Sequence, residues 1–179
     1  MTYVILMIGA PGTGKTTISN KLVDTLDNIK RISQDQFYNN KKADVEAYLE
    51  AIEQAILYHN LILDKNHHNE SSRQQVIEIL ERHHVSYFTI NLFPEELEKK
   101  ECPDIEQKEH VLNILLQRIQ ERQTDSHLLI TDEASYKKAR NVLLYGFIKP
   151  YQPPTVSLRL PYQTPIEEKV TQIIEYIKK

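Results

Sequence analysis

Short apolar runs alternate with amphipathic stretches along the chain. Five runs are rich in β-branched or aromatic residues and predict buried strands at residues 3–8, 29–33, 61–63, 86–93 and 156–160. Between them, apolar residues recur every three or four positions, which predicts helices near residues 17–26, 44–58, 69–80, 110–122, 134–148 and 165–179. Strands that alternate with helices in this way predict an α/β fold with a five-stranded, doubly wound parallel sheet.

Local signals indicate where several of these elements begin and end. Ser71 or Ser72 is the expected cap of the helix that opens near residue 69, and Pro165 is expected to start the terminal helix. The charged stretch 95–109 predicts an irregular surface loop, and the polar residues 123–126 predict a break after the helix before them. No repeat or linker interrupts the pattern, so residues 1–179 are expected to form one domain.

Charge balance and cysteine content limit the function classes. The 179 residues include 22 basic and 25 acidic side chains, a net charge of −3. This balance excludes a broad basic face for gripping duplex nucleic acid, so any contact to a polynucleotide is expected to be local. Cys102 is the only cysteine, which excludes an internal disulfide. No apolar run reaches membrane-spanning length and a strand begins almost at once, so we expect a soluble intracellular protein of the cytoplasm or nucleus, with no membrane partner.

The strongest chemical signal is a glycine-rich loop between the first strand and the first helix. Residues 9–16 have the pattern G-x-x-x-x-G-K-S/T, and this order aims backbone N–H groups and a helix dipole at one point. Lys15 is expected to reach the outer phosphates of a nucleoside triphosphate, and the Thr16 hydroxyl to ligate Mg²⁺. The predicted nucleotide-binding residues are Gly12, Thr13, Gly14, Lys15, Thr16 and Thr17.

A candidate catalytic base follows the second predicted strand. Gln34 and Asp35 come at its carboxyl end, and ligands of open parallel sheets bind beyond the carboxyl ends of the strands. We expect this strand to lie next to the glycine-rich loop, with Asp35 accepting the proton of an attacking hydroxyl and Gln34 contacting the substrate. The alternative is that Asp35 caps the following helix.

Two further sets of charged residues are candidates for the same site. Asp64 ends the third predicted strand, where it either holds a Mg²⁺-bound water or orients Lys65 and the next helix. Arg118 and Arg122 lie four residues apart on one helix face before a polar break, as expected for a lid that closes over the triphosphate. The alternative is that both arginines are ordinary surface residues.

Two histidine pairs, His67–His68 and His83–His84, suggest metal ligands at first sight. Adjacent residues project in different directions, however, and no third ligand has suitable spacing. A metal role is therefore disfavoured for both pairs, and the second pair is expected at a helix end.

Several of these segments together carry a family resemblance. In chain order they are residues 9–17, residues 33–37, residues 62–68 with Arg73, Arg118-x-x-x-Arg122 with His127, and residues 146–153. This combination resembles the kinase domain of fungal tRNA ligases, which is related to phage-type 5′ polynucleotide kinases. The resemblance runs in order through most of the chain.

The resemblance implies a P-loop kinase fold with an arginine-bearing lid. It implies phosphorylation of the 5′-OH end of single-stranded or nicked RNA in tRNA splicing or RNA repair, with GTP as the favoured donor, ATP as a possible one and Mg²⁺ as cofactor. Lys15 and Thr16 then fall at the phosphate and metal positions, Asp35 at the general base, and Arg118 with Arg122 in the lid. RNA ligase and phosphodiesterase components are expected partners, in the same chain or in separate ones.

The acceptor side is expected to use a few local cations. Lys65, Arg73 and Arg140 are candidates for contacts with phosphates near the RNA end. The family's third-strand motif usually reads Asp-Arg-Asn-Asn-His, whereas this chain has Lys65 for the arginine and His67 for the second asparagine. Lysine cannot make the planar, two-pronged phosphate contact of arginine, which puts the role of residue 65 in question.

Two other functions use the same loop. A kinase of a small metabolite or nucleoside monophosphate would also need a P-loop and an arginine lid. A nucleotide-dependent switch or binding module is an alternative of another class, although no guanine-reading Asn-Lys-x-Asp sequence follows a strand. The sequence does not identify the residues that read the nucleobase, and residues 147–151 are interpreted as packing.

Overall fold

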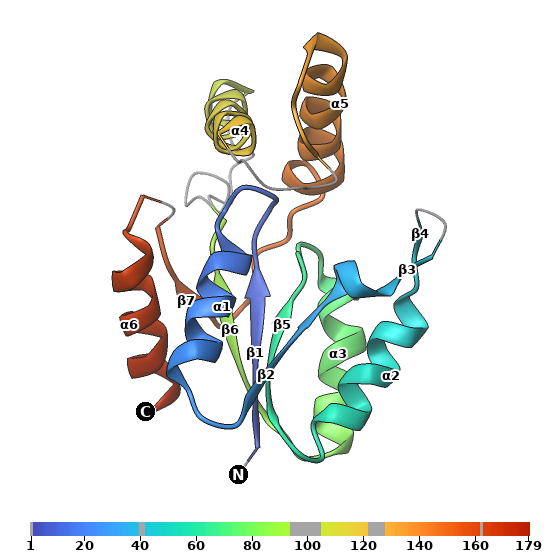
Figure 1. The fold of residues 1–179 in the computed structure, drawn as a ribbon, viewed down its shortest axis with the longest axis vertical. Helices are drawn as coiled ribbons and strands as arrows, with labels where there is room; N and C mark the ends of the chain where they lie inside the picture. The colour runs from blue at the N-terminus through green and yellow to red at the C-terminus, as the bar shows by residue number, and fades with distance from the viewer. Residues whose placement is uncertain (1, 40–41, 94–104, 122–127, 162) are drawn as a thin grey trace.

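A five-stranded parallel sheet forms the centre of the computed structural model, which describes residues 2–39, 42–93, 105–121, 128–161 and 163–179 (Figure 1). The strands lie in the order β2-β5-β1-β6-β7, and every neighbouring pair is parallel. The bounds are β1 (Tyr3–Ile8), β2 (Ile29–Ser33), β5 (Asn60–Asp64), β6 (Ser86–Asn91) and β7 (Leu158–Arg159). The predicted five-stranded α/β fold is confirmed.

Helices cover both faces of this sheet and its carboxyl edge (Figure 1). They are α1 (Lys15–Thr25), α2 (Val45–Ala55), α3 (Glu70–Arg82), α4 (Ile105–Gln120), α5 (Glu133–Leu143) and α6 (Ile166–Ile177). Among the described residues, no helix combines the length and the apolar character that a membrane span requires.

The alternation of side chains along β1 explains this layering. Val4 and Leu6 point to one face and pack against α2 and α3, whereas Ile5 and Met7 point to the other and pack against α1 and α6. Ile8, at the end of the strand, belongs to a third apolar cluster with α4 and α5. The α4 and α5 pair therefore stands over the carboxyl edge, where the ligands of such sheets bind.

The strand order corrects one prediction that matters for the site. The strand next to β1 on this side is β5, and β2 lies one position farther out. After β1 and α1, the chain forms β2 two positions away from β1. After α2 it returns to form β5 in the position between them. Asp64 therefore ends the strand beside the phosphate loop, and Asp35 follows the strand beyond it.

Several element boundaries also differ from the prediction. Asn69, not Ser71 or Ser72, caps α3, because its Oδ1 accepts the Ser72 N–H at 2.8 Å. Residues 105–109 form the start of α4 and are not loop, while residues 94–104 and the predicted break at 123–126 lie outside the described residues. Pro165 precedes α6 as its cap residue instead of opening it.

Three short elements were not predicted. A 3₁₀ turn, η1 (Gln34–Phe37), follows β2 and leads to a hairpin of β3 (Tyr38–Asn39) and β4 (Lys42–Ala43). Such short turns carry too few residues for a periodic hydrophobic signal. The π-helical turn η3 (Leu144–Ile148), by contrast, continues α5 within the helix predicted at residues 134–148.

Candidate active site

The loop between β1 and α1 has the backbone of an anion site. Gly12 and Gly14 have φ angles of 94° and 90°, a left-handed conformation that side chains disfavour. Gly14 is the cap residue of α1, and no side chain caps the first N–H groups of that helix. Uncapped N–H groups at the positive end of the helix dipole are available to a phosphate.

Two predicted nucleotide-binding side chains close the loop upon itself. Lys15 Nζ donates to the Ala10 carbonyl at 3.1 Å, and Thr13 Oγ1 donates to the same oxygen at 2.9 Å. Both side chains are buried, so the loop already holds an ammonium group among its backbone N–H groups. Thr16 and Thr17, on the first turn of α1, are exposed.

Gly12 also sets how closely α4 approaches the loop. A Cβ at this position would lie 3.2 Å from the Leu115 carbonyl oxygen of α4, and φ is +94°. Gly12→Ala is therefore expected to lower the free energy of unfolding by about 1–3 kcal/mol and to weaken nucleotide binding. Urea unfolding and nucleoside diphosphate titration would measure both effects.

Gly146→Ala is the matched control for that substitution. A Cβ there meets no atom within 4 Å, and the residue lies in a helical turn. The expected effect is neutral or stabilising by up to about 1 kcal/mol. Equal effects of the two alanines would contradict the close approach inferred at Gly12.

The carboxylate of Asp64 joins three elements. Its Oδ2 accepts from Thr16 Oγ1 at 2.9 Å, from Arg31 Nε at 2.9 Å and from Arg31 Nη2 at 2.7 Å. The structure thus brings together Thr16 and Asp64, the two predicted metal residues. The Lys65 ammonium lies 5.0 Å from the ring centroid of Tyr48, and the alternative role of Asp64, orienting Lys65 and the next helix, stays open.

This donor set fits Mg²⁺ in chemical terms. A hydroxyl and a carboxylate supply the oxygen ligands that this hard cation prefers. They lie at the first turn of α1, beside the N–H groups that can hold a phosphate. Whether Thr16 and Asp64 hold a metal stays a prediction.

Asp35 lies in η1, at the carboxyl edge of the sheet, with an exposed side chain. Ser33 Oγ, not the Asp35 carboxylate, caps this turn: it accepts the Asp35 N–H at 3.4 Å. The Gln36 side chain completes the cap by accepting the Ser33 N–H at 3.2 Å. The helix that follows, α2, is capped by Asp44, whose Oδ1 accepts the Ala47 N–H at 3.0 Å. The capping interpretation of Asp35 is therefore wrong, and its carboxylate is exposed at the carboxyl edge of the sheet. The half-buried Gln34 begins the same turn.

The segment from residue 64 to residue 68 is tied to the phosphate loop. The Gly9 N–H donates to the Asn66 carbonyl at 3.1 Å, and Arg73 Nη1 donates to the His67 carbonyl at 3.0 Å. The Arg73 side chain is buried, and burial lowers its pKa. Arg73 thus supports this segment from within, whereas Lys65 and Arg73 as RNA contacts remain predictions.

Positive charge gathers around this segment. Burial lowers the pKa of His68, and the nearby charges of Lys65, Arg73 and Lys15 lower it further. Burial also lowers the pKa of Lys65. The cations therefore raise the potential at the carboxyl edge, where an anionic ligand would be stabilised, although the whole chain is acidic.

His67 gives the fold a sensitivity to acid. The ring is fully buried, and burial followed by the charge of Lys65 lowers its pKa to about 3. An unfolded histidine binds its proton near pH 6.5, so the unfolded state binds more protons between pH 6.5 and 3, and stability falls as pH falls through that window. Because each pKa unit corresponds to about 1.4 kcal/mol, the full loss is a few kcal/mol.

His67→Asn is expected to flatten this pH dependence. Asparagine does not titrate, and it tolerates the left-handed backbone found here, with φ at 43°. Urea unfolding at pH 7, 5.5 and 4 would show the stability of the variant rising relative to that of the unsubstituted chain as pH falls. His84→Asn, at an exposed left-handed position, is the control. Parallel pH profiles for His67→Asn and the unsubstituted chain would contradict the assignment.

Of the two predicted lid arginines, the structure describes one. Arg118 is half-buried near the end of α4, one turn after the Leu115 carbonyl that faces Gly12. Arg122 lies outside the described residues, so the lid remains a prediction.

Lys169 is a candidate residue of the phosphate site that the sequence interpretation missed. It is only 1% exposed on α6, and burial followed by the charge of Arg118 lowers its pKa to about 8. The same helix reaches the phosphate loop, because the side chain of Ile166 would contact a Cβ on Gly14. A signal was present: Lys169 interrupts the apolar face that Ile166 and Ile173 define. Arg31 was also missed, since only the strand order shows that it faces Asp64.

Phe147 and Tyr151 pack against neighbouring rings, as the interpretation of residues 147–151 favoured. Tyr151 stacks on Phe93 with ring centroids 3.9 Å apart, and its hydroxyl accepts from Asn91 Nδ2 at 2.7 Å. Phe147 meets the ring of His68 edge-on. The Gln152 side chain accepts the Glu70 N–H at 2.7 Å, at the start of α3. This segment therefore braces the loop that carries Lys65.

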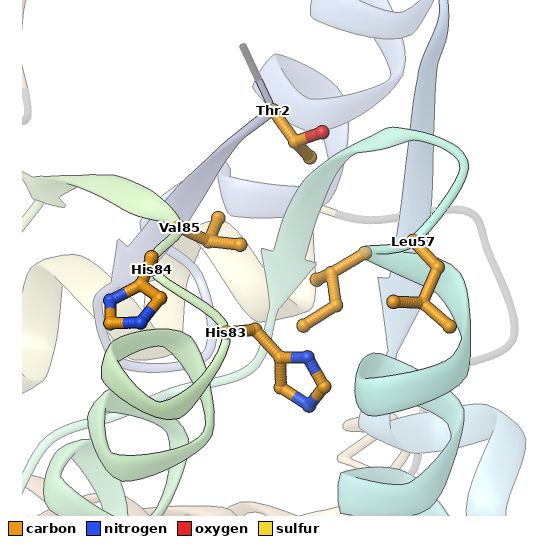
Figure 2. A pocket seen from close by; sticks show the side chains of 6 residues that line it. Thr2, Leu57, His83, His84 and Val85 are labelled. Carbon is orange, nitrogen blue, oxygen red and sulfur yellow. The ribbon is translucent and has the colours of Figure 1, made fainter.

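The second histidine pair lies at the opposite edge of the sheet. His83 ends α3, as predicted, and its Nε2 lies 2.8 Å from Glu53 Oε1. Figure 2 shows both rings beside a hollow of about 280 Å³, lined by Thr2, Ile56, Leu57, His83, His84 and Val85. Within the described ranges, no three His, Cys, Asp or Glu side chains are grouped to hold a metal.

The strand order, the glycine-rich loop and the Thr16–Asp64 contact define a P-loop fold. A family model described as the tRNA ligase kinase domain matches residues 4–163. The match covers most of the sequence, so the chain belongs to the tRNA ligase kinase domain family.

Similar solved structures share the fold. A fungal RNA kinase is 20% identical with a TM-score of 0.62, covering 98% of this chain and 85% of that chain. A sugar kinase from Janibacter is 15% identical with a TM-score of 0.61, covering 99% and 95%. The APS kinase of Mycobacterium tuberculosis, in complex with AMPPNP and APS, is 16% identical with a TM-score of 0.60, covering 99% and 98%. No curated protein matches significantly by sequence.

Proposed function

We propose that this chain is a 5′-hydroxyl polynucleotide kinase that transfers the γ-phosphoryl group of a nucleoside triphosphate, preferably GTP, to the 5′-OH end of RNA. Membership of the tRNA ligase kinase family supports this function, and the name of the similar fungal RNA kinase agrees with it. The observation that carries the proposal is that an uncapped phosphate loop and an exposed Asp35 lie at the same edge of one sheet.

The phosphate loop binds the donor. The N–H groups of the first turn of α1 and the Lys15 ammonium hold the β- and γ-phosphates, and this ammonium stabilises the charge that develops during transfer. Lys15 leaves the Ala10 carbonyl for a phosphate oxygen, a stronger acceptor. Mg²⁺, held through Thr16 and Asp64, would supply additional neutralisation of the phosphate charge.

Asp35 serves the acceptor. Its carboxylate orients the 5′-hydroxyl and takes the hydroxyl proton as the oxygen attacks the γ-phosphorus. The bond between the γ-phosphorus and the β,γ-bridging oxygen breaks, and the nucleoside diphosphate leaves with that electron pair. Gln34 lies beside the base to contact the terminal nucleotide.

A few cations complete the site. Arg118 and Arg122 act from the lid on the transition-state charge, and Lys65 and Arg73 provide the positive potential that attracts the RNA end. Because these contacts are local, an acidic chain can still bind RNA. We extend the proposal to one domain over residues 1–179, acting with RNA ligase and phosphodiesterase components in the same or separate chains.

A labelled-phosphate assay tests this proposal. Each of four γ-labelled donors, GTP, ATP, CTP and UTP, is supplied in turn with Mg²⁺. The acceptors compared are a 5′-OH RNA, a 5′-OH DNA, a 5′-phosphorylated RNA, and a panel of metabolites and nucleoside monophosphates. Transfer to 5′-OH RNA, strongest with GTP, is expected. Transfer to a small metabolite alone would establish the metabolite kinase instead. Hydrolysis that no acceptor accelerates would favour the nucleotide-dependent switch.

A further inference from the structure

Arg31 connects two strands at the candidate metal position. It lies on β2, where it pairs in register with Ile62, and reaches past that residue to Asp64 at the end of β5. Two of its nitrogens, Nε and Nη2, donate to the same oxygen, Asp64 Oδ2, at 2.9 Å and 2.7 Å. Thr16 Oγ1 donates to that oxygen as well, at 2.9 Å.

The direction of the Thr16 bond matters for a metal. Because the Thr16 hydroxyl gives its only proton to Asp64, its lone pairs are the part left to face a cation at the phosphate loop. A fixed carboxylate behind a ligand in this way orients the ligand and tunes its affinity. Asp64 is fixed in turn by Arg31, whose two nitrogens hold it from the β2 side.

The charges around Asp64 indicate that a cation binds here only weakly unless a nucleotide is present. The Asp64 side chain is 3% exposed and that of Arg31 is 26% exposed, so the pair is shielded from solvent more than a surface pair is. A cation that enters without a nucleotide finds a carboxylate already paired with a guanidinium. Among the described residues, no three His, Cys, Asp or Glu side chains are grouped to hold a metal by themselves. The negative charge that a divalent cation needs must then come from the phosphates of the donor.

We infer that Arg31 is a positioning residue of the donor site: it holds Asp64 against Thr16 and prevents metal binding to the nucleotide-free protein, so that Mg²⁺ enters together with the nucleotide. This inference rests on the proposed metal role of Thr16 and Asp64. The observed contact of Arg31 is with Asp64, and its inferred effect on the metal is exerted through that carboxylate.

Paramagnetic Mn²⁺ provides the direct test, because free Mn²⁺ can be counted by electron paramagnetic resonance. The nucleotide-free chain is expected to bind Mn²⁺ very weakly. Arg31→Gln exposes the unpaired charge of Asp64 and is expected to bind Mn²⁺ at least about ten-fold more tightly without nucleotide. In Arg31→Gln/Asp64→Asn, the gained affinity disappears. Arg31→Lys keeps the positive charge but can donate to Asp64 from only one nitrogen. Its Mn²⁺ affinity is expected to lie between those of the unsubstituted chain and Arg31→Gln.

Arg82→Gln is the matched control, since Arg82 forms an exposed pair with Glu53 at 2.8 Å, away from the phosphate loop. It is expected to leave Mn²⁺ binding unchanged. Tight Mn²⁺ binding by the unsubstituted, nucleotide-free chain would overturn the inference, as would unchanged binding in folded Arg31→Gln. If Arg31→Gln fails to fold, the comparison of Arg31→Lys with the unsubstituted chain decides in the same way.

The readout separates this inference from the proposed function. Mn²⁺ binding without nucleotide requires no acceptor, so it can agree with the inference even if RNA is not phosphorylated. A turnover assay adds the complementary measurement: at saturating Mg²⁺ and nucleotide, Arg31→Gln is expected to lower kcat by about ten-fold, because Thr16 is no longer oriented. An unchanged kcat would contradict the orienting role of Arg31.

Discussion

Asp35→Asn is expected to reduce kcat for phosphorylation of a 5′-OH RNA by about 10²–10⁴-fold and to leave nucleotide affinity within about two-fold. The amide has the shape of the carboxylate but cannot take the proton of the attacking hydroxyl. The side chain is exposed, and the Ser33–Gln36 cap that shapes its turn does not use the carboxylate, so the fold should persist. Steady-state kinetics with a labelled donor, together with calorimetric nucleotide titration, would measure the two effects.

Asp27→Asn is the control for Asp35→Asn. Asp27 is an equally exposed aspartate, but it precedes β2 and so lies at the amino edge of the sheet, away from the phosphate loop. It should retain full activity. Full activity in Asp35→Asn would remove this residue from the chemistry, and a parallel loss of nucleotide affinity would assign it to the donor instead.

Lys15→Met should cost about 3–4 kcal/mol of transition-state stabilisation, a loss of about 10²–10³-fold in kcat/KM. Methionine fills much of the same buried space but brings no charge to the phosphate oxygens. Single-turnover rates at saturating nucleotide would isolate the chemical step from binding.

Lys21→Met provides the comparison, because Lys21 belongs to the same helix and forms an exposed pair with Glu167 at 2.8 Å. Its activity should stay within about two-fold of the unsubstituted chain. A similar loss in both variants would indicate a general effect on α1 and not the absence of a phosphate contact.

The long elements could be predicted from the sequence because their signals are local. The apolar run at Tyr3–Ile8 and the glycines after it specify a strand, a tight loop and a helix start within a few residues, and the structure has all three. Asp35 and Asp64 were correctly placed at strand ends for the same reason.

The pairing of distant strands was not available from these local patterns. The sequence interpretation put β2 beside the phosphate loop, although β5 lies there, and it consequently missed Arg31 as the partner of Asp64. Lys169 was overlooked because a lysine on a terminal helix is usually solvated, and only the packing of α6 buries it. The predicted cap residue of α3 was wrong because Asn69, Ser71 and Ser72 are all suitable caps, and only the backbone geometry decides among them.

In the proposed mechanism, the short strand β2 serves both substrates. Arg31 within it contacts Asp64 at the proposed donor site, and Asp35, the proposed base for the acceptor, lies just beyond its end. Because the strand is only five residues long and pairs with β5 along its whole length, it fixes the distance between Arg31 and Asp35, and so between the two proposed substrate sites. Under the proposed function, acceptor specificity could therefore be altered by substitutions in the η1 turn, around Asp35, that leave the Arg31–Asp64 contact of the donor site unchanged.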